Sequence, residues 1–326
     1  MSDKYNDKPL IIIGGPTAVG KTDLSIDLAR KINGSIISAD SMQIYKYMDI
    51  GSAKIMPEEM RGVPHYLIDE LEPNEEFGVN IFQQMAYKAL DDIYSKGRIP
   101  IITGGTGFYI QALLYEIDFT EETPHDDIYR KELEQIAETE EGKLRLFDEL
   151  CKTDPEYTKG LHANNSRRVI RALEYYRYTG RKFSEYNEEQ REKISPFNYL
   201  YIALTDDREK IYSRIDKRVD IMMDKGLLGE VTKLHQMGYN RSYNSMQGIG
   251  YKELLDHLDG LITLDEAVER IKLDTRHFAK RQLTWLRREK DVVFLNKSDY
   301  NSEDVLLNKI LEIAEDKNIW TDCISS

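Results

Sequence analysis

The chain has 326 residues, 40% of them hydrophobic, and a formal net charge of −13, a composition typical of a globular protein with a full hydrophobic core. No apolar run approaches the ~20 residues of a membrane-spanning helix. Residues 1–8 are polar, which argues against a secretory signal. Two cysteines, Cys151 and Cys323, provide neither a disulfide framework nor zinc-ligand spacing. We therefore expect a cytoplasmic protein with no membrane partner.

The segment from residue 10 to residue 29 carries the strongest motif. An apolar run at residues 10–13 predicts a buried strand, and residues 23–29 have helical spacing. Between them, residues 15–22 fit the phosphate-cradling pattern G-x-x-x-x-G-K-[ST], in which backbone N–H groups close around an anion and the lysine adds a point charge. The residues predicted to bind phosphate are Gly15, Thr17, Ala18, Val19, Gly20, Lys21 and Thr22, and the Thr22 hydroxyl is the predicted Mg²⁺ ligand.

Asp40 follows a second apolar run, at residues 35–39. In a parallel sheet its carboxylate would stand at the same edge as the phosphate loop, where it could hold Mg²⁺ or act as a general base. An aspartate followed by a serine after a strand is also a common helix N-cap or turn residue. Position alone leaves these alternatives open.

Further strands are predicted at residues 66–68 and 99–103, with a helix at residues 79–94 between them. This alternation of strand and helix is typical of an α/β domain with a parallel sheet. The strand at 99–103 runs into a glycine-rich turn, residues 104–107, that is another potential anion site. It does not end in the aspartate expected of a Walker B element, which argues against an ordinary ATPase.

Residues 119–197 lose the strand signals and show helical spacing throughout, which predicts a helical insertion. Charge is distributed unevenly here. Residues 118–150 hold 12 acidic and 4 basic residues, whereas residues 164–182 hold 6 basic and 1 acidic residue. The basic segment contains a cluster at helical spacing, made of Arg167, Arg168 and Arg171.

The pattern then returns to strand at residues 199–204 and 292–295, with helices at residues 208–237, 264–290 and 302–314. In the first of these helices Arg214 and Arg218 are one turn apart and could reach an anion. Ion pairs with Asp220 or Asp224 are an equally good interpretation of the spacing.

The helix at residues 264–290 is strongly basic in its second half. Residues 270–290 hold 8 basic and 2 acidic residues. The sevenfold spacing of Ile271, Phe278 and Trp285 predicts a core stripe, with Arg276, Lys280 and Arg287 on the opposite face and Arg281 beside them. Such a row is often only a solvated face, but in an acidic protein it favours contact with a phosphate backbone.

Together these patterns predict an α/β fold with a P-loop-like parallel-sheet core and a helical insertion. The first part of the core is predicted at residues 1–118, the insertion at 119–197, and the second part of the core, with the basic helix, at 198–326.

Eight segments, taken in order, resemble bacterial tRNA dimethylallyltransferases, also called tRNA isopentenyltransferases. The likeness spans residues 8–295 and departs from the family pattern at Ile55, where proline is frequent, and at Tyr66, where a second histidine is usual. The eukaryotic zinc finger is absent from this sequence. The matching segments are residues 15–22, 38–45, 49–54, 62–69, 104–109, 167–174, 247–253 and 280–287.

The resemblance implies transfer of a dimethylallyl group from dimethylallyl diphosphate to N6 of the adenosine just 3′ of the tRNA anticodon. It implies that Asp40 is the base, that Thr106 contacts the substrate backbone and that Arg218 contacts the diphosphate. It further implies Mg²⁺ as cofactor, and tRNA held by its anticodon stem-loop; we expect a monomer. The residues implied to bind tRNA are Asp40, Ser41, Met42, Gln43, Thr106, Arg130, Arg167, Arg168, Val169, Ile170, Arg171, Gln247, Gly248, Ile249, Gly250, Tyr251, Lys252, Arg276, Lys280, Arg281 and Arg287.

Three alternative functions remain open from the sequence. A small-molecule or nucleotide kinase would use the same loop with ATP. An adenylate isopentenyltransferase would prenylate free AMP, ADP or ATP and would need no insertion that grips tRNA. A non-catalytic RNA-binding protein would carry a vestigial loop, but Lys21, Thr22 and Asp40 are intact.

Overall fold

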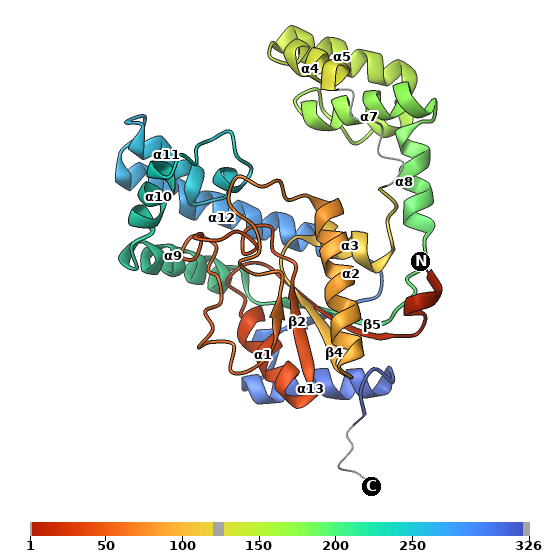
Figure 1. The fold of residues 1–326 in the computed structure, drawn as a ribbon, viewed down its shortest axis with the longest axis vertical. Coiled ribbons are helices and arrows are strands. Elements are labelled where there is room, and N and C mark those ends of the chain that lie inside the picture. The colour runs from red at the N-terminus through yellow and green to blue at the C-terminus, as the bar shows by residue number, and fades with distance from the viewer. Residues whose placement is uncertain (1, 120–126, 322–326) are drawn as a thin grey trace. The chain divides into compact units, whose positions relative to one another are not determined.

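A computed structural model describes residues 2–119 and 127–321 of the chain (Figure 1). The chain divides into two compact units. The core unit contains Met1–Leu114 and Pro196–Ser326, and the insertion unit is Tyr115–Ser195. Part of the predicted insertion, residues 120–126, and Cys323 lie outside the described residues.

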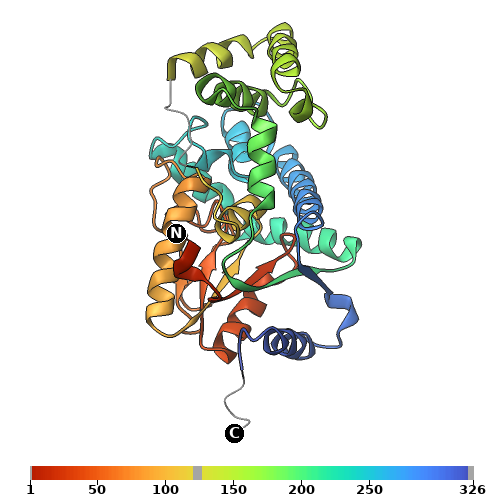
Figure 2. The ribbon, with the colours of Figure 1, turned by 90° about the vertical axis from the view of Figure 1, so that its right-hand side faces the viewer.

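The core unit is built on a six-stranded, all-parallel sheet with strand order β3-β2-β4-β1-β5-β6. Figure 2 shows strands of this sheet with helices packed around them. This confirms the predicted α/β class and P-loop-like core. The strand predicted at residues 66–68 is shorter and starts earlier than expected. The strands are β1 (Pro9–Gly14), β2 (Gly34–Ser38), β3 (His65–Tyr66), β4 (Ile99–Thr103), β5 (Asn198–Thr205) and β6 (Val292–Asn296).

The register of the sheet aligns the strand ends that matter for a site. Ile13 of β1 pairs with Thr103 of β4, and Ser38 of β2 pairs with the same threonine. The loops that follow β1, β2 and β4 therefore start side by side at the carboxyl edge, where parallel sheets bind ligands. The central strand β1 is fully buried from Leu10 to Ile13, as expected of a strand covered on both faces.

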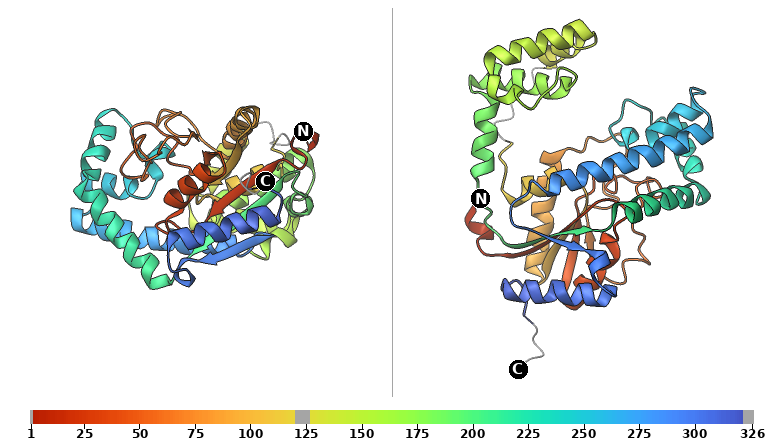
Figure 3. Two further views of the ribbon diagram at one scale, coloured as in Figure 1. Left: turned by 90° about the horizontal axis from the view of Figure 1, so that it is seen from below. Right: turned by 180° about the vertical axis from the view of Figure 1, so that it is seen from behind.

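Helices cover this sheet and extend beyond its edge. Helices α1 and α13 lie side by side (Figure 3). They contribute to one hydrophobic core with strand residues such as Ile11 and Ile202. Helices α9 and α12 also contact each other (Figure 3). The core helices are α1 (Lys21–Lys31), α2 (Val79–Ser95), α3 (Gly107–Leu114), α9 (Arg208–Asp224), α10 (Leu227–Gln236), α11 (Tyr251–Leu258), α12 (Leu264–Leu286) and α13 (Glu303–Asp316), with 3₁₀ turns at Ser2–Tyr5, Ser245–Gln247 and Lys297–Asp299.

Two helix predictions differ from the structure. The single helix predicted at residues 208–237 is two helices, because the chain turns at Gly226, whose φ of 98° is a left-handed conformation that favours glycine. The helix predicted at residues 264–290 ends at Leu286.

The insertion unit is helical, and its helices enclose a core of their own. Leu133, Leu146, Leu150 and Leu173 are buried at its centre. Cys151 is a free thiol in this unit. The helices are α4 (Asp127–Ile136), α5 (Glu140–Thr153), α6 (Pro155–Thr158), α7 (Ser166–Thr179) and α8 (Phe183–Glu192). Within the described ranges, no helix of either unit is long and apolar enough to cross a membrane.

Candidate active site

The phosphate loop leaves β1 and ends at the first turn of α1. Gly15 has φ of 147°, and a Cβ there would lie 2.7 Å from the Leu204 carbonyl oxygen, so only glycine fits. Gly20 and Ala18 also have positive φ values, 94° and 62°. The strand–loop–helix context predicted for this motif is therefore present, and the N-terminus of α1 faces any anion bound in the loop.

Lys21 begins α1 and its ammonium turns back over the loop. Its Nζ donates hydrogen bonds to the carbonyl oxygens of Gly15 (3.0 Å) and Pro16 (2.9 Å). Burial, and then repulsion by Arg218, lower the pKa of Lys21 to about 8, although Asp40 attracts the charge and opposes this. Lys21 is thus electrostatically coupled to two of the predicted catalytic residues.

Asp40 follows β2 and lies in a turn, which is one of the alternatives left open by the sequence. Its Oδ1 accepts a hydrogen bond from the backbone N–H of Met42 at 2.8 Å, which makes it a turn residue and not a helix cap. Burial raises the pKa of this carboxyl, and it outweighs the opposing hydrogen bonds and the attraction of Lys21 and Arg218. A raised pKa makes the carboxylate a stronger base.

Thr106 lies beside Asp40 because the turn after β4 packs against the end of β2. The N–H of Thr106 donates to the carbonyl oxygen of Ala39 at 3.3 Å. A Cβ on Gly104 would lie 2.3 Å from that same oxygen, so this close approach requires glycine. The Thr106 side chain is half-buried at the sheet edge.

Arg218 reaches the same cluster from α9. It forms no hydrogen bond or ion pair with any residue that the structure describes, so the alternative of ion pairs with Asp220 or Asp224 is not observed. Burial lowers the pKa of Arg218, while Asp40 and Asp23 oppose this by attraction. Its neighbour Arg214, by contrast, is paired with Asp206.

Gln282 of α12 joins two of these loops, and sequence reasoning did not single it out. Its Oε1 accepts the backbone N–H of Thr17 at 2.8 Å, and its Nε2 donates to the Gly105 carbonyl oxygen at 3.1 Å. Gln282 is buried, so both hydrogen bonds lie out of water. The sequence carries no clear signal for Gln282, because a polar residue in a helix is ordinarily expected at the surface.

The buried face of the basic helix α12 agrees with the predicted core stripe only at Ile271. Phe278 and Trp285 are half-buried, and the buried positions of this helix are Ala267, Ile271, Ala279, Gln282 and Leu286. They follow the 3.6-residue period, not the sevenfold stripe that was predicted.

The cations of α12 also divide into two groups. Arg276 is ion-paired with Asp216 at 3.0 Å. Lys280, Arg281 and Arg287 are exposed, and within the described ranges none has an ion-pair partner.

In the insertion unit the predicted RNA-binding residues fall into three groups. Arg167 and Arg168 are exposed at the start of α7, and Arg171 is half-buried on the same helix. Val169 and Ile170 are 1% and 3% exposed and pack in the core, so their side chains hold α7 in place and do not reach its surface. Arg130 is paired with Glu134 at 3.1 Å and with the buried Glu174 at 3.2 Å.

Two further predicted segments, residues 41–43 and 247–252, are brought together in the core unit. Their contact is close, since a Cβ on Gly248 would lie 2.5 Å from Met42 Cε. Ser41, Met42 and Gln43 are partly exposed. In the second segment Gln247 is exposed, Ile249 is partly exposed, Gly250 and Tyr251 are buried, and Lys252 is paired with Asp274.

The fold and the loop define a P-loop-like α/β enzyme, and comparisons with known proteins identify its kind. A family model for IPP transferase matches residues 43–289. A tRNA dimethylallyltransferase of Lachnoclostridium phytofermentans is 57% identical over 312 residues, 96% of this chain and 99% of that protein. One of Acetivibrio thermocellus is 51% identical over 304 residues, 93% of this chain and 96% of that protein.

Solved structures give the same result. A tRNA isopentenylpyrophosphate transferase of Bacillus halodurans matches with a TM-score of 0.72 and 42% identity, over 96% of this chain and 98% of that one. A eukaryotic dimethylallyltransferase acting on tRNA matches with a TM-score of 0.80 and 32% identity, over 95% of this chain and 80% of that one. The chain belongs to the IPP transferase family, and it is a prenyltransferase of the tRNA dimethylallyltransferase class. The predicted family and reaction are confirmed.

Proposed function

We propose that Asp40 is the base when this chain transfers the dimethylallyl group of dimethylallyl diphosphate to N6 of the adenosine 3′ of the anticodon, position 37. The observation that carries this assignment is the cluster of Asp40, Lys21 and Arg218. The carboxyl has a raised pKa, and it is electrostatically coupled to two cations at the phosphate loop. A base next to an anion cradle suits a reaction in which an amine attacks while a diphosphate leaves.

The leaving diphosphate is held by the loop backbone together with Lys21 and Arg218. As the allylic C–O bond breaks, negative charge grows on the diphosphate oxygens. Preorganised N–H groups and cations stabilise that charge, and they do so most strongly where water is excluded. Arg218 is suited to this because it lacks a protein partner among the described residues.

The adenosine amine forms the new C–N bond and then loses a proton to Asp40. A positioned carboxylate typically contributes a factor of about 10²–10⁴ to such a step. The base must leave its stack in the anticodon loop to reach the cluster, so base flipping is part of the proposal. To Thr106, whose backbone N–H donates to the carbonyl oxygen of Ala39, the residue before Asp40, we assign a contact with the RNA backbone.

Magnesium fits the oxygen of Thr22. This side chain lies exposed in the first turn of α1, next to Lys21, and no described residue occupies its hydroxyl. The described residues hold no cluster of three or more His, Cys, Asp or Glu for a metal, but Mg²⁺ usually takes only one or two protein ligands and completes its shell with phosphate oxygens and water. When bound, the ion would supply charge stabilisation for the diphosphate.

The RNA is held by exposed cations on each unit, and we propose that the enzyme acts on it as a monomer. In the insertion unit these are Arg167 and Arg168, and in the core unit they are Lys280, Arg281 and Arg287. Their positive surfaces stand out in a chain of net charge −13, which favours specific contact with phosphates over general attraction.

The double variant Lys280→Glu/Arg287→Glu is expected to weaken binding of an anticodon stem-loop by at least about tenfold, and to flatten the salt dependence of log K by roughly 0.7–0.9 for each lost phosphate contact. Fluorescence anisotropy across a salt series measures both. The matched control is Arg30→Glu/Lys31→Glu, which makes the same charge change at the end of α1 farthest from the phosphate loop. Equal losses in the two double variants would mean that α12 attracts RNA only through net charge.

Incubation with labelled dimethylallyl diphosphate tests the reaction itself. We expect label to enter an anticodon stem-loop with adenosine at position 37, and not one with guanosine there, and not AMP or ATP. Liquid chromatography and mass analysis of the nucleosides identify the product. Labelled AMP would instead favour an adenylate isopentenyltransferase, and ATP turnover without RNA would favour a kinase.

A further inference from the structure

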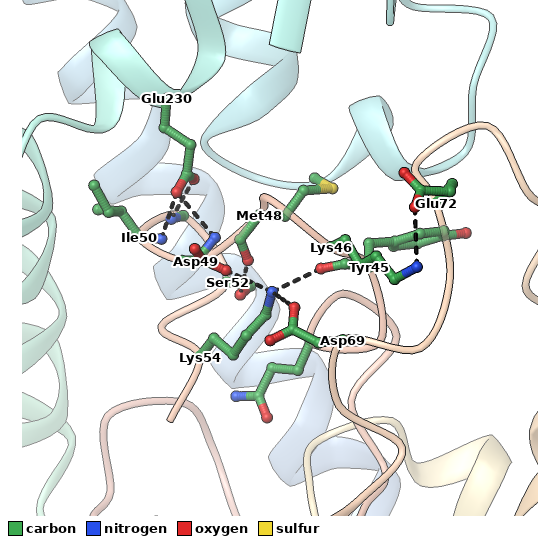
Figure 4. A network of polar contacts seen from close by, with 12 residues as sticks. Tyr45, Lys46, Met48, Asp49, Ile50, Ser52, Lys54, Asp69, Glu72 and Glu230 are labelled. Carbon is green, nitrogen blue, oxygen red and sulfur yellow. Dashed lines mark hydrogen bonds and ion pairs between the residues drawn. The ribbon is translucent and has the colours of Figure 1, made fainter. Parts of the chain in front are cut away.

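Glu230 of α10 holds a loop that lies far from it in the sequence. Its Oε2 accepts the backbone N–H groups of Asp49 (2.9 Å) and Ile50 (2.7 Å), and its Oε1 accepts that of Gly51 at 3.1 Å. Figure 4 shows the carboxylate pointing into this turn. Three successive N–H groups around one carboxylate form the kind of cradle that binds anions, and here the anion is part of the protein.

Tyr251 completes this contact from a third segment. Its hydroxyl donates to Glu230 Oε1 at 2.8 Å. Its ring lies so close to Gly51 that a Cβ there would be 2.6 Å from ring atoms. Burial, and then Glu230, raise the pKa of Tyr251 well above its ordinary value, so the hydroxyl keeps its proton and remains a donor.

Further hydrogen bonds connect the turn of residues 49–51 to residues that follow Asp40. Lys54, buried below the turn, donates to the Tyr45 carbonyl oxygen at 2.7 Å and pairs with Asp49 at 2.6 Å (Figure 4). Gln43 Nε2 donates to the Ala53 carbonyl oxygen at 3.3 Å. A chain of hydrogen bonds therefore runs from Glu230, through the loop, to Gln43, which lies three residues after Asp40.

We propose that Glu230 is a positioning residue for the RNA substrate: its carboxylate fixes the turn of residues 49–51 against Tyr251, and so holds residues 41–43 and 247–252 as one recognition surface. This inference rests on the proposed function and on the contact of those two segments with tRNA that the family resemblance implies. Glu230 makes none of its hydrogen bonds to the phosphate loop. Its loss should therefore affect the RNA and not the prenyl donor.

The variant Glu230→Gln separates charge from size. Its amide has one acceptor oxygen, and its NH₂ group would face N–H donors. We expect the KM for the anticodon stem-loop to rise at least tenfold, while the KM for dimethylallyl diphosphate stays within twofold. Hydrogen exchange followed by mass spectrometry should show at least tenfold faster exchange at residues 49–51.

The matched control is Glu72→Gln. Glu72 pairs with Lys46 of the same loop at 2.9 Å but contacts none of the three N–H groups, so both KM values and the exchange should stay near wild type. If Glu230→Gln does not fold, Tyr251→Phe tests the proposal instead, because this variant removes the hydrogen bond to Glu230 and keeps the aromatic ring. Here we expect a smaller rise, about threefold, in the RNA KM alone.

An unchanged RNA KM in Glu230→Gln, or an equal rise of both KM values, would overturn the proposal. The first result would mean that the clamp does not serve RNA binding, and the second that Glu230 supports the fold in general. A wild-type enzyme that fails to prenylate the stem-loop would count against the proposed function instead. Hydrogen exchange at residues 49–51 shows whether Glu230 still holds this turn whichever result is obtained, because the measurement needs no RNA.

Discussion

Replacing Asp40 with asparagine is expected to lower kcat for prenyl transfer by about 10²–10⁴-fold, because the amide cannot accept the N6 proton. The substitution keeps the shape of the residue and its Oδ1, so the hydrogen bond from the Met42 N–H, 2.8 Å in the structure, can still form. Affinity for the stem-loop, measured by anisotropy, should remain within about threefold. Single-turnover transfer of labelled donor measures the loss.

Asp40→Ala serves as the companion variant, since it removes the turn hydrogen bond as well as the base. If Asp40 acts mainly in the turn, asparagine would preserve activity and alanine would not. If Asp40 acts as the base, both variants lose transfer to a similar extent. Near-normal turnover in Asp40→Asn would refute the assignment.

Replacing Lys21 with methionine is expected to lower kcat/KM for dimethylallyl diphosphate by about 10²–10³-fold, the cost of removing one donor to a developing oxyanion. The wild-type enzyme should show the same loss gradually as pH rises. The pKa of Lys21 is lowered to about 8, so its charge is complete well below pH 8 and disappears as pH rises through that value. kcat/KM reports the free enzyme, in which this pKa applies.

The control for this prediction is the pH profile of Lys21→Met, which should be low and lack the alkaline limb near pH 8. Steady-state kinetics across a pH series, with the donor varied and RNA held well below its KM, measures both. An alkaline limb that persists in Lys21→Met would assign it to another group. Asp40 does not cause it, because its base form is lost as pH falls, not as pH rises.

The sequence predicted the strands more closely than the long helices. Buried runs such as residues 10–13 and 99–103 have glycine or polar residues at their ends, so their limits are visible locally. The break between α9 and α10 depends on Gly226 in a left-handed conformation, and a single glycine within a helical pattern does not show that. The core face of α12 was misplaced because one of its buried members is Gln282, a polar residue.

For the site, topology predicted that Lys21, Asp40 and Thr106 follow neighbouring strands, because parallel strands end at one edge of the sheet. Arg218 lies in a helix 178 positions after Asp40 in the numbering, and no local pattern places it at that edge. The helical spacing was equally consistent with an anion contact and with an ion pair for Arg218. Only the three-dimensional structure shows that Asp40 and Asp23 are the acidic groups near it. Glu230 had no signal in the sequence, since three of its partners are backbone N–H groups and the fourth, Tyr251, lies 21 positions away.

The strand order has a consequence for how the chain folds during synthesis. The central strand β1, at Pro9–Gly14, pairs on one side with β5, whose residues Asn198–Thr205 are made only after the whole insertion unit. Residues 115–195 enclose their own core and can fold first as a unit, while the emerged half of the sheet exposes an unpaired edge of β1. Leu204, whose carbonyl oxygen would lie 2.7 Å from a Cβ on Gly15, is therefore added beside the phosphate loop only after the whole insertion has been synthesised. The phosphate loop thus reaches the conformation of the finished protein only once β5 has paired with β1.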